Sequence, residues 1–248
     1  MPETDLFLYD TGTRSDVGRV RDHNEDSLLA RPDYGLWVVA DGMGGHAAGD
    51  FASQTIVAEL AEIGVPGSLD DLQARVMLRL GQATRAIQAR SAALGGVTVG
   101  ATLVALLIHE DQFACLWAGD SRIYLLRAGR LYRLTEDHTE VQQLLSAGAI
   151  TPEQARVWPR RNVITRAIGV ADPPECERVA GRVEPGDLFL LCSDGLTGHV
   201  EDPELEQMMA GGAPQAICDA LVALVLERGA HDNVTAVALR CHPAPIAY

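Results

Sequence analysis

Four short apolar segments of this sequence each begin or end at an aspartate beside a glycine or an asparagine. These aspartates are Asp41, Asp120, Asp194 and Asp232. A short apolar run bounded by turn residues predicts a strand buried on both faces, so its terminal acid lies where the sheet meets solvent. Hard divalent cations prefer oxygen ligands of this kind. The pattern therefore indicates one metal site at the rim of a sheet.

Each aspartate taken alone also fits a turn residue, because Asp-Gly is a common hairpin turn signal. Turn chemistry does not explain why strongly apolar strands repeatedly end in an acid where Asn, Ser or Gly would serve. Four such ends in one chain favour the metal interpretation.

The hydrophobic pattern predicts strand-rich stretches separated by pairs of helices. Strands are expected over 17–21, 27–30, 36–40, 101–108, 113–118, 122–126, 130–134, 177–183, 187–192 and 234–241. Helices are expected over 51–63, 72–87, 140–147, 152–157, 203–210 and 214–227. The segment 101–134 is predicted to form one four-stranded antiparallel run, and 177–192 a hairpin. Because regular βαβ alternation is missing, the pattern indicates a layered α+β domain.

The composition fits one globular domain. The chain has 248 residues, of which 47% are hydrophobic, and a formal net charge of −14, which disfavours nucleic acid as a partner. Its longest uncharged apolar stretch is too short to span a bilayer, so we expect no membrane insertion. The N-terminus is acidic where a secretory signal would be basic, and the five scattered cysteines fit reduced thiols, so we expect a cytoplasmic protein.

Six short motifs stand in order along the chain. They are Arg21-Asp22-His23-Asn24-Glu25-Asp26, Val39-Ala40-Asp41-Gly42-Met43-Gly44-Gly45-His46, Gly100-Ala101-Thr102, Ala118-Gly119-Asp120-Ser121-Arg122, Ser193-Asp194-Gly195-Leu196-Thr197 and Asp232-Asn233-Val234-Thr235. As a set they resemble the metal-dependent protein serine/threonine phosphatases of the PPM (type 2C) family in its compact bacterial form. The resemblance implies a four-layer αββα sandwich, two central antiparallel sheets flanked by helix pairs. The resemblance spans residues 17–241, and with the one domain that the composition indicates it implies a single catalytic domain over 1–248. The polar, irregular stretch at about 148–169 predicts a surface flap.

The resemblance implies a centre of two Mn²⁺ or Mg²⁺ ions. Asp41 would bridge both ions, Asp194 and Asp232 would complete one, and the backbone carbonyl of Gly42 would complete the other.

Four further residues match supporting positions of the family. Glu25 would act through coordinated water, and Asp26 would support the ligands. Asp120 matches the weaker position of a third ion, and Arg21 matches the arginine that grips the substrate phosphate.

The implied activity is a protein phosphoserine/phosphothreonine phosphatase. Metal-bound hydroxide would attack the phosphomonoester in line, without a phosphoenzyme. The cysteines lack a phosphate loop and Ser193 lacks an evident base, so neither supplies another nucleophile. The implied partners are phosphorylated proteins and a cognate bacterial Ser/Thr kinase, and we expect a monomer.

Two positions depart from many relatives. Met43 stands where many animal members have a histidine, which leaves His46 or a water as candidate proton donor. Gly198 stands where many relatives have an acid, which puts the third ion in doubt. His138 is interpreted as a helix cap or supporting residue in preference to a catalytic one.

Two other functions compete with the phosphatase. One is a non-catalytic module that docks a metal or a phosphoprotein. The other is a metal-dependent phosphoesterase that acts on a small phosphorylated metabolite.

Overall fold

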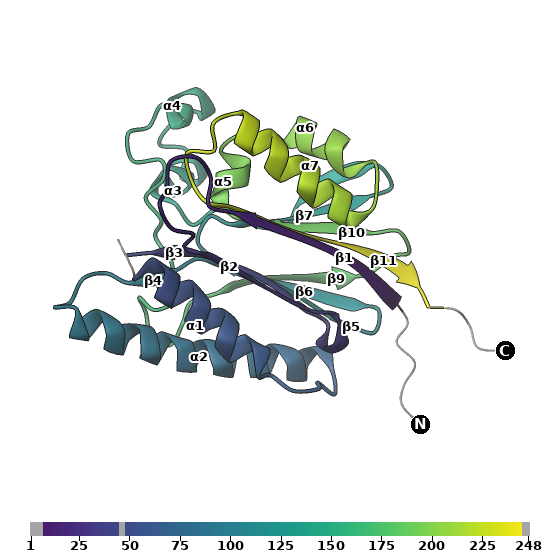
Figure 1. Cartoon of the computed structure of the whole chain (residues 1–248), viewed down its shortest axis with the longest axis horizontal. Helices are drawn as coiled ribbons and strands as arrows, with labels where there is room; N and C mark the ends of the chain where they lie inside the picture. Colours follow the sequence, from purple (N-terminus) through teal and green to yellow (C-terminus); the bar gives the residue numbers. More distant parts are fainter. Residues whose placement is uncertain (1–6, 45–47, 245–248) are drawn as a thin grey trace.

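Two antiparallel β-sheets lie face to face in the computed structural model, which describes residues 7–44 and 48–244 (Figure 1). The first sheet has the strand order β1-β11-β10-β7-β8. Its strands are β1 (Phe7–Asp16), β11 (Val234–Pro243), β10 (Leu188–Cys192), β7 (Arg122–Arg127) and β8 (Arg130–Arg133). The second has the order β2-β3-β5-β6-β9, with the short strand β4 paired to β3. Its strands are β2 (Asp26–Arg31), β3 (Leu36–Met43), β4 (Gly100–Ala101), β5 (Leu103–His109), β6 (Gln112–Ala118) and β9 (Glu177–Arg182).

Helices cover both outer faces and so complete four layers (Figure 1). The second sheet packs against α1 (Gly49–Ala61) and α2 (Leu69–Ala93), and the first against α6 (Asp202–Met209) and α7 (Pro214–Glu227). Three further helices, α3 (Glu140–Ser146), α4 (Pro152–Arg156) and α5 (Asp194–Thr197), lie toward one end of the sandwich, and a 3₁₀ turn, η1, spans Pro32–Tyr34. The predicted α+β sandwich of two sheets and helices is confirmed.

Strand β3 shows how the sequence supplies two cores at once. Successive side chains of a strand point to opposite faces. Trp37 and Val39 therefore pack between the two sheets, while Leu36 and Val38 pack against the helices. All four are fully buried, which explains why the sequence of this strand is continuously apolar and does not alternate between apolar and polar residues.

Several predicted elements differ from the structure. Residues 18–20 form a turn, so the strand expected over 17–21 is wrong, and β1 was not foreseen because its polar sequence hides the pattern. Strands β6 and β7 follow each other in sequence but belong to different sheets, as do β9 and β10. The expected four-stranded run and the expected hairpin are therefore both wrong. Hydrophobic periodicity reports that a strand exists, but it does not report which sheet receives it.

The switches between sheets also place the functional residues. Strand β3, the β6–β7 crossover, the start of α5 and the loop before β11 meet at the end of the sandwich opposite the two ends of the described chain (Figure 1).

In the part of the chain that the structure describes, no helix is long and apolar enough to cross a membrane. All five cysteines are free thiols, four of them buried, as expected.

Candidate active site

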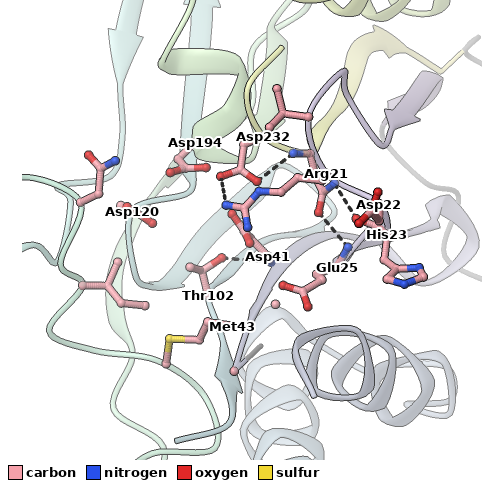
Figure 2. A pocket seen from close by; sticks show the side chains of 16 residues that line it. Arg21, Asp22, His23, Glu25, Asp41, Met43, Thr102, Asp120, Asp194 and Asp232 are labelled. Carbon is pink, nitrogen blue, oxygen red and sulfur yellow. Dashed lines mark hydrogen bonds and ion pairs between the residues drawn. The ribbon is translucent and has the colours of Figure 1, made fainter. Parts of the chain in front are cut away.

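A cavity of about 530 Å³ opens where the two sheets end. Figure 2 shows acidic side chains carried at the ends of both sheets and turned toward its interior, with Arg21 reaching across them. The acids that line it are Asp22, Glu25, Asp41, Asp120, Asp194 and Asp232. Asn162 and Ile164, from the predicted flap, form part of its wall.

Asp41 is held by Thr102. The backbone N–H of Asp41 donates to Oγ1 of Thr102 over 3.1 Å, and the Asp41 carbonyl accepts from the Thr102 N–H over 2.8 Å. The same Thr102 hydroxyl lies 2.8 Å from the Ser121 hydroxyl. One buried threonine thus fixes both Asp41 and the segment that carries Asp120 (Figure 2).

Asp120 lies in the crossover from β6 to β7. Gly119, directly before it, has φ of +110°, and a Cβ there would approach the Thr102 Cβ to 2.6 Å. Only glycine tolerates both conditions, so the crossover turns tightly against Thr102. This turn directs the Asp120 side chain into the cavity.

Asp194 begins α5, where a carboxylate is favoured by the helix dipole. The preceding residue, Ser193, donates its hydroxyl to Oδ2 of Asp26 over 2.8 Å and accepts from the Thr235 N–H over 3.0 Å. Ser193 therefore joins β2 and β11 beneath the cavity. Oδ1 of Asp26 is buried and has no hydrogen-bond partner in the structure.

Arg21 forms an ion pair with Asp232, with 2.8 Å between Nη2 and Oδ2. The neighbouring Asn233 organises the loop that carries Arg21. Its side chain donates to the carbonyls of Val17 and His23 over 2.9 Å and accepts from the Glu25 N–H over 2.8 Å.

Glu25 approaches the cavity from beside the start of α1. The Gly42 N–H donates to the Glu25 carbonyl over 3.1 Å, and a side chain on Gly42 would collide with the Gly49 backbone. Glycines at both positions let β3 and α1 close around Glu25.

Burial and mutual repulsion disfavour ionised carboxylates here. Burial, with repulsion from Asp26 and Asp194, raises the pKa of Asp41 well above its usual value. Burial and the charge of Asp194 raise the pKa of Asp120 to about 8. Burial raises the pKa of Asp26 to about 7, although hydrogen bonds from Thr235 and Ser193 oppose the shift. The pKa values of Asp194 and Glu25 are raised as well, mainly by burial.

The donor chemistry of the cavity fits divalent cations. Carboxylate oxygens are the ligands that Mg²⁺ and Mn²⁺ prefer, and a cation relieves the repulsion that raises these pKa values. Within the described residues, no three acidic, histidine or cysteine side chains are grouped closely enough to hold an ion as they stand. Asp232 is paired with Arg21 instead.

The structure brings nearly all of the predicted site residues to one cavity. The predicted residues that line it are Arg21, Glu25, Asp41, Gly42, Asp120, Asp194 and Asp232, and Asp26 lies beneath the cavity. Met43 also lines the cavity, whereas Gly198 ends α5 outside the lining residues. His46 falls at 45–47, outside the described residues.

Three residues have roles that the sequence did not reveal. The hydrogen bonds that position the acids are formed by Thr102, Ser193 and Asn233. Each of these residues stands in one of the six motifs, and that position was the signal that the sequence offered. His138 is not a helix cap, because Thr139 caps α3 by accepting from the Gln142 N–H.

Comparisons with known proteins agree with this geometry. The protein phosphatase 2C family profile matches residues 19–225. The serine/threonine protein phosphatase PstP of Mycobacterium tuberculosis (strain CDC 1551 / Oshkosh) is 40% identical over 227 residues, which are 90% of this chain and 43% of PstP. The chain thus spans less than half the length of that relative.

Two solved structures are similar over almost the whole chain. PppA, described as a key regulatory component of T6SS in Pseudomonas aeruginosa, has a TM-score of 0.86 and 45% identity, covering 94% of this chain and 97% of PppA. The catalytic domain of PstP in complex with two manganese ions has a TM-score of 0.83 and 37% identity, covering 95% and 99%. With the matching profile and the shared fold, these similarities show that the chain belongs to the protein phosphatase 2C family.

Proposed function

We propose that this protein is a metal-dependent phosphatase that hydrolyses phosphoserine and phosphothreonine in proteins. The observation that carries the proposal is the convergence of six acids, carried at the ends of both sheets, on one cavity that Arg21 enters. Family membership and the two manganese ions in the PstP structure support it.

We further propose two Mn²⁺ or Mg²⁺ ions in this cavity, held by Asp41, Asp194, Asp232 and the Gly42 carbonyl, with Glu25 acting through water. A weaker third position would use Asp120. The ions, when bound, supply positive charge that activates water and offsets the charge of the phosphoryl group.

The chain's own residues bind and orient the substrate. The planar guanidinium of Arg21 can present two parallel N–H groups to phosphate oxygens, which a lysine cannot do. In the structure one of these donors, on Nη2, is bonded to Asp232, so Arg21 would exchange a carboxylate for the phosphate. Hydrogen bonds with Thr102, Ser193 and Asn233 hold Asp41, Asp26 and Glu25 in position while that exchange occurs.

The flap is proposed to select the protein substrate. Asn162 and Ile164 form part of the cavity wall, and exposed arginines stand directly before Asn162 at positions 160 and 161. Loops beside a fixed site commonly carry specificity.

The proposal includes four further points. Residues 1–248 form a single catalytic domain, the protein acts as a monomer, it opposes a cognate Ser/Thr kinase, and His46 is a candidate proton donor. We also propose a cytoplasmic location, which the free thiols support because a reducing compartment keeps cysteines unpaired.

Substrate competition tests this function. Purified protein with Mn²⁺ is offered phosphothreonine and phosphoserine peptides beside phosphorylated sugars and nucleotides. We expect kcat/KM to be highest for the peptides. A preference for one of the small metabolites would contradict the protein-phosphatase assignment, and metal binding without any turnover would favour a docking module.

A further inference from the structure

His138 lies between two parts of the molecule that are distant in sequence, the β6–β7 crossover and the C-terminal end of the flap. It is 7% exposed, and its ring stacks on Trp117 with 6.0 Å between centroids and 17° between planes. This burial fixes the orientation of the ring, so its two nitrogens face defined partners.

One side of His138 holds the crossover. The Gly119 N–H donates to Nδ1 of His138 over 3.2 Å, and the His138 N–H donates to the Gly119 carbonyl over 2.9 Å. Because Nδ1 accepts a hydrogen bond, it carries a lone pair, and the ring proton of the neutral histidine must lie on Nε2.

The other side of His138 holds the flap. Its Nε2 lies 3.3 Å from both Oε1 of Glu177 and Nη1 of Arg166, and that carboxylate oxygen accepts from the same Nη1 over 2.6 Å. The His138 carbonyl also accepts from the Thr165 N–H over 2.7 Å. Thr165 and Arg166 follow directly after Ile164, which lines the cavity.

Asp120 is the next residue after Gly119, and the tight packing of Gly119 on Thr102 leaves the crossover little freedom. A shift of the Gly119 amide would therefore also move Asp120, whose side chain lines the cavity. A contiguous set of contacts runs from the flap through Arg166, Glu177 and His138 to this carboxylate.

We propose that His138 is a positioning residue that links the C-terminal end of the flap to the Asp120 carboxylate. The ring faces Glu177 and Arg166 through Nε2 and accepts from the Gly119 N–H through Nδ1. Displacement of the flap by a bound phosphopeptide thereby changes the position of Asp120. The functional meaning of the link rests on the proposed phosphatase activity, whereas the link itself is a property of the folded chain.

Amide hydrogen exchange at Gly119, measured by NMR on the EDTA-treated full chain, tests the link without substrate. Arg166→Gln removes the flap's ion pair with Glu177 but touches neither Gly119 nor Asp120. Arg160→Gln is the matched control, because Arg160 is a flap arginine paired with Glu140 and not with Glu177. Thermal melting and circular dichroism confirm that each variant is folded.

We expect Arg166→Gln to speed Gly119 exchange about two- to fivefold, as weakening of a partly exposed ion pair would, and Arg160→Gln to leave it unchanged. His138→Asn places an amide oxygen near the position of Nδ1 but does not reach Glu177. In that background, Arg166→Gln should no longer affect Gly119. A residue that merely filled space would not produce this loss of coupling.

The inference is overturned if Arg166→Gln leaves Gly119 exchange unchanged, if Arg160→Gln changes it equally, or if the effect of Arg166→Gln persists in His138→Asn. None of these outcomes depends on turnover, so failure of the link is distinguishable from failure of the proposed activity.

Discussion

The guanidinium of Arg21 donates to the Asp232 carboxylate over 2.8 Å, inside the cavity that five other acids line (Figure 2). Both side chains remain about half exposed, so the pair is accessible to an incoming anion. The arginine thus occupies the position from which it can transfer its donors to a phosphate.

Replacement of Arg21 should mainly weaken substrate binding. Charged hydrogen bonds contribute about 1.5–3 kcal/mol, so we expect Arg21→Ala to raise KM by about 10- to 100-fold. Arg21→Lys should recover only part of this loss, because it keeps the charge but not the paired donors. Steady-state kinetics on a phosphothreonine peptide measure both, with Arg19→Ala as the control. Unchanged KM and kcat in Arg21→Ala would remove Arg21 from the site.

Removal of the Thr102 hydroxyl should impair both stability and turnover. Thr102→Val leaves the Asp41 N–H and the Ser121 hydroxyl without this buried partner, at a cost of about 1–3 kcal/mol in the free energy of unfolding. Because Asp41 loses its support, kcat should fall as well, while Thr102→Ser should behave more like the parent.

Thr84→Val is the matched control for that substitution. The Thr84 hydroxyl is also buried, but it has no hydrogen-bond partner in the structure, so the nearly isosteric valine should be neutral or stabilising. Denaturant unfolding compares the two variants. Equal losses of stability would show that the Thr102 hydrogen bonds contribute nothing specific.

The metal-stripped protein should become less stable as the pH rises. The pKa of Asp120 is about 8 in the folded chain, raised mainly by burial, against about 3.9 when unfolded. Between these values the folded state binds more protons, so stability is greatest at the acidic end and falls toward pH 8. One such group gives a slope of at most about 1.4 kcal/mol per pH unit.

Asp120→Asn removes this titration. Its unfolding free energy, measured by urea denaturation in EDTA at pH 5 to 8, should therefore depend less on pH than that of the parent. Identical slopes in the two proteins would contradict the assignment of the raised pKa to Asp120.

The sequence revealed the chemistry of the site better than the arrangement of the strands. Asp41 and Asp194 could be recognised because each follows a buried apolar run, and a charged side chain beside a buried strand is costly unless it has a partner or a function. The support from Thr102 and Asn233 depends on contacts across the fold, Thr102 lying 61 residues from Asp41 and Asn233 lying 208 from Glu25. Local periodicity carries no information about such distant pairs.

Replacement of the flap should alter substrate preference more than chemistry. Exchange of residues 148–169 for the flap of a relative keeps the acids of the cavity but changes the wall formed by Asn162 and Ile164. We expect kcat/KM to be reordered among phosphopeptides, with a smaller effect on a minimal aryl phosphate. Equal effects on both kinds of substrate would count against a role in specificity.

The central claim is that metal held by these acids catalyses phosphate release from a phosphoprotein. The most direct measurement is phosphate release from a phosphothreonine peptide by protein stripped of metal and then supplied with Mn²⁺ or Mg²⁺. Asp194→Ala and Asp232→Ala are compared with Asp33→Ala, a surface aspartate paired with Arg31. We predict activity that metal restores in the parent and in Asp33→Ala, and no turnover in the other two variants, with the fold retained. Full activity in Asp194→Ala or Asp232→Ala, or no release from folded parent protein with either metal, would contradict the claim.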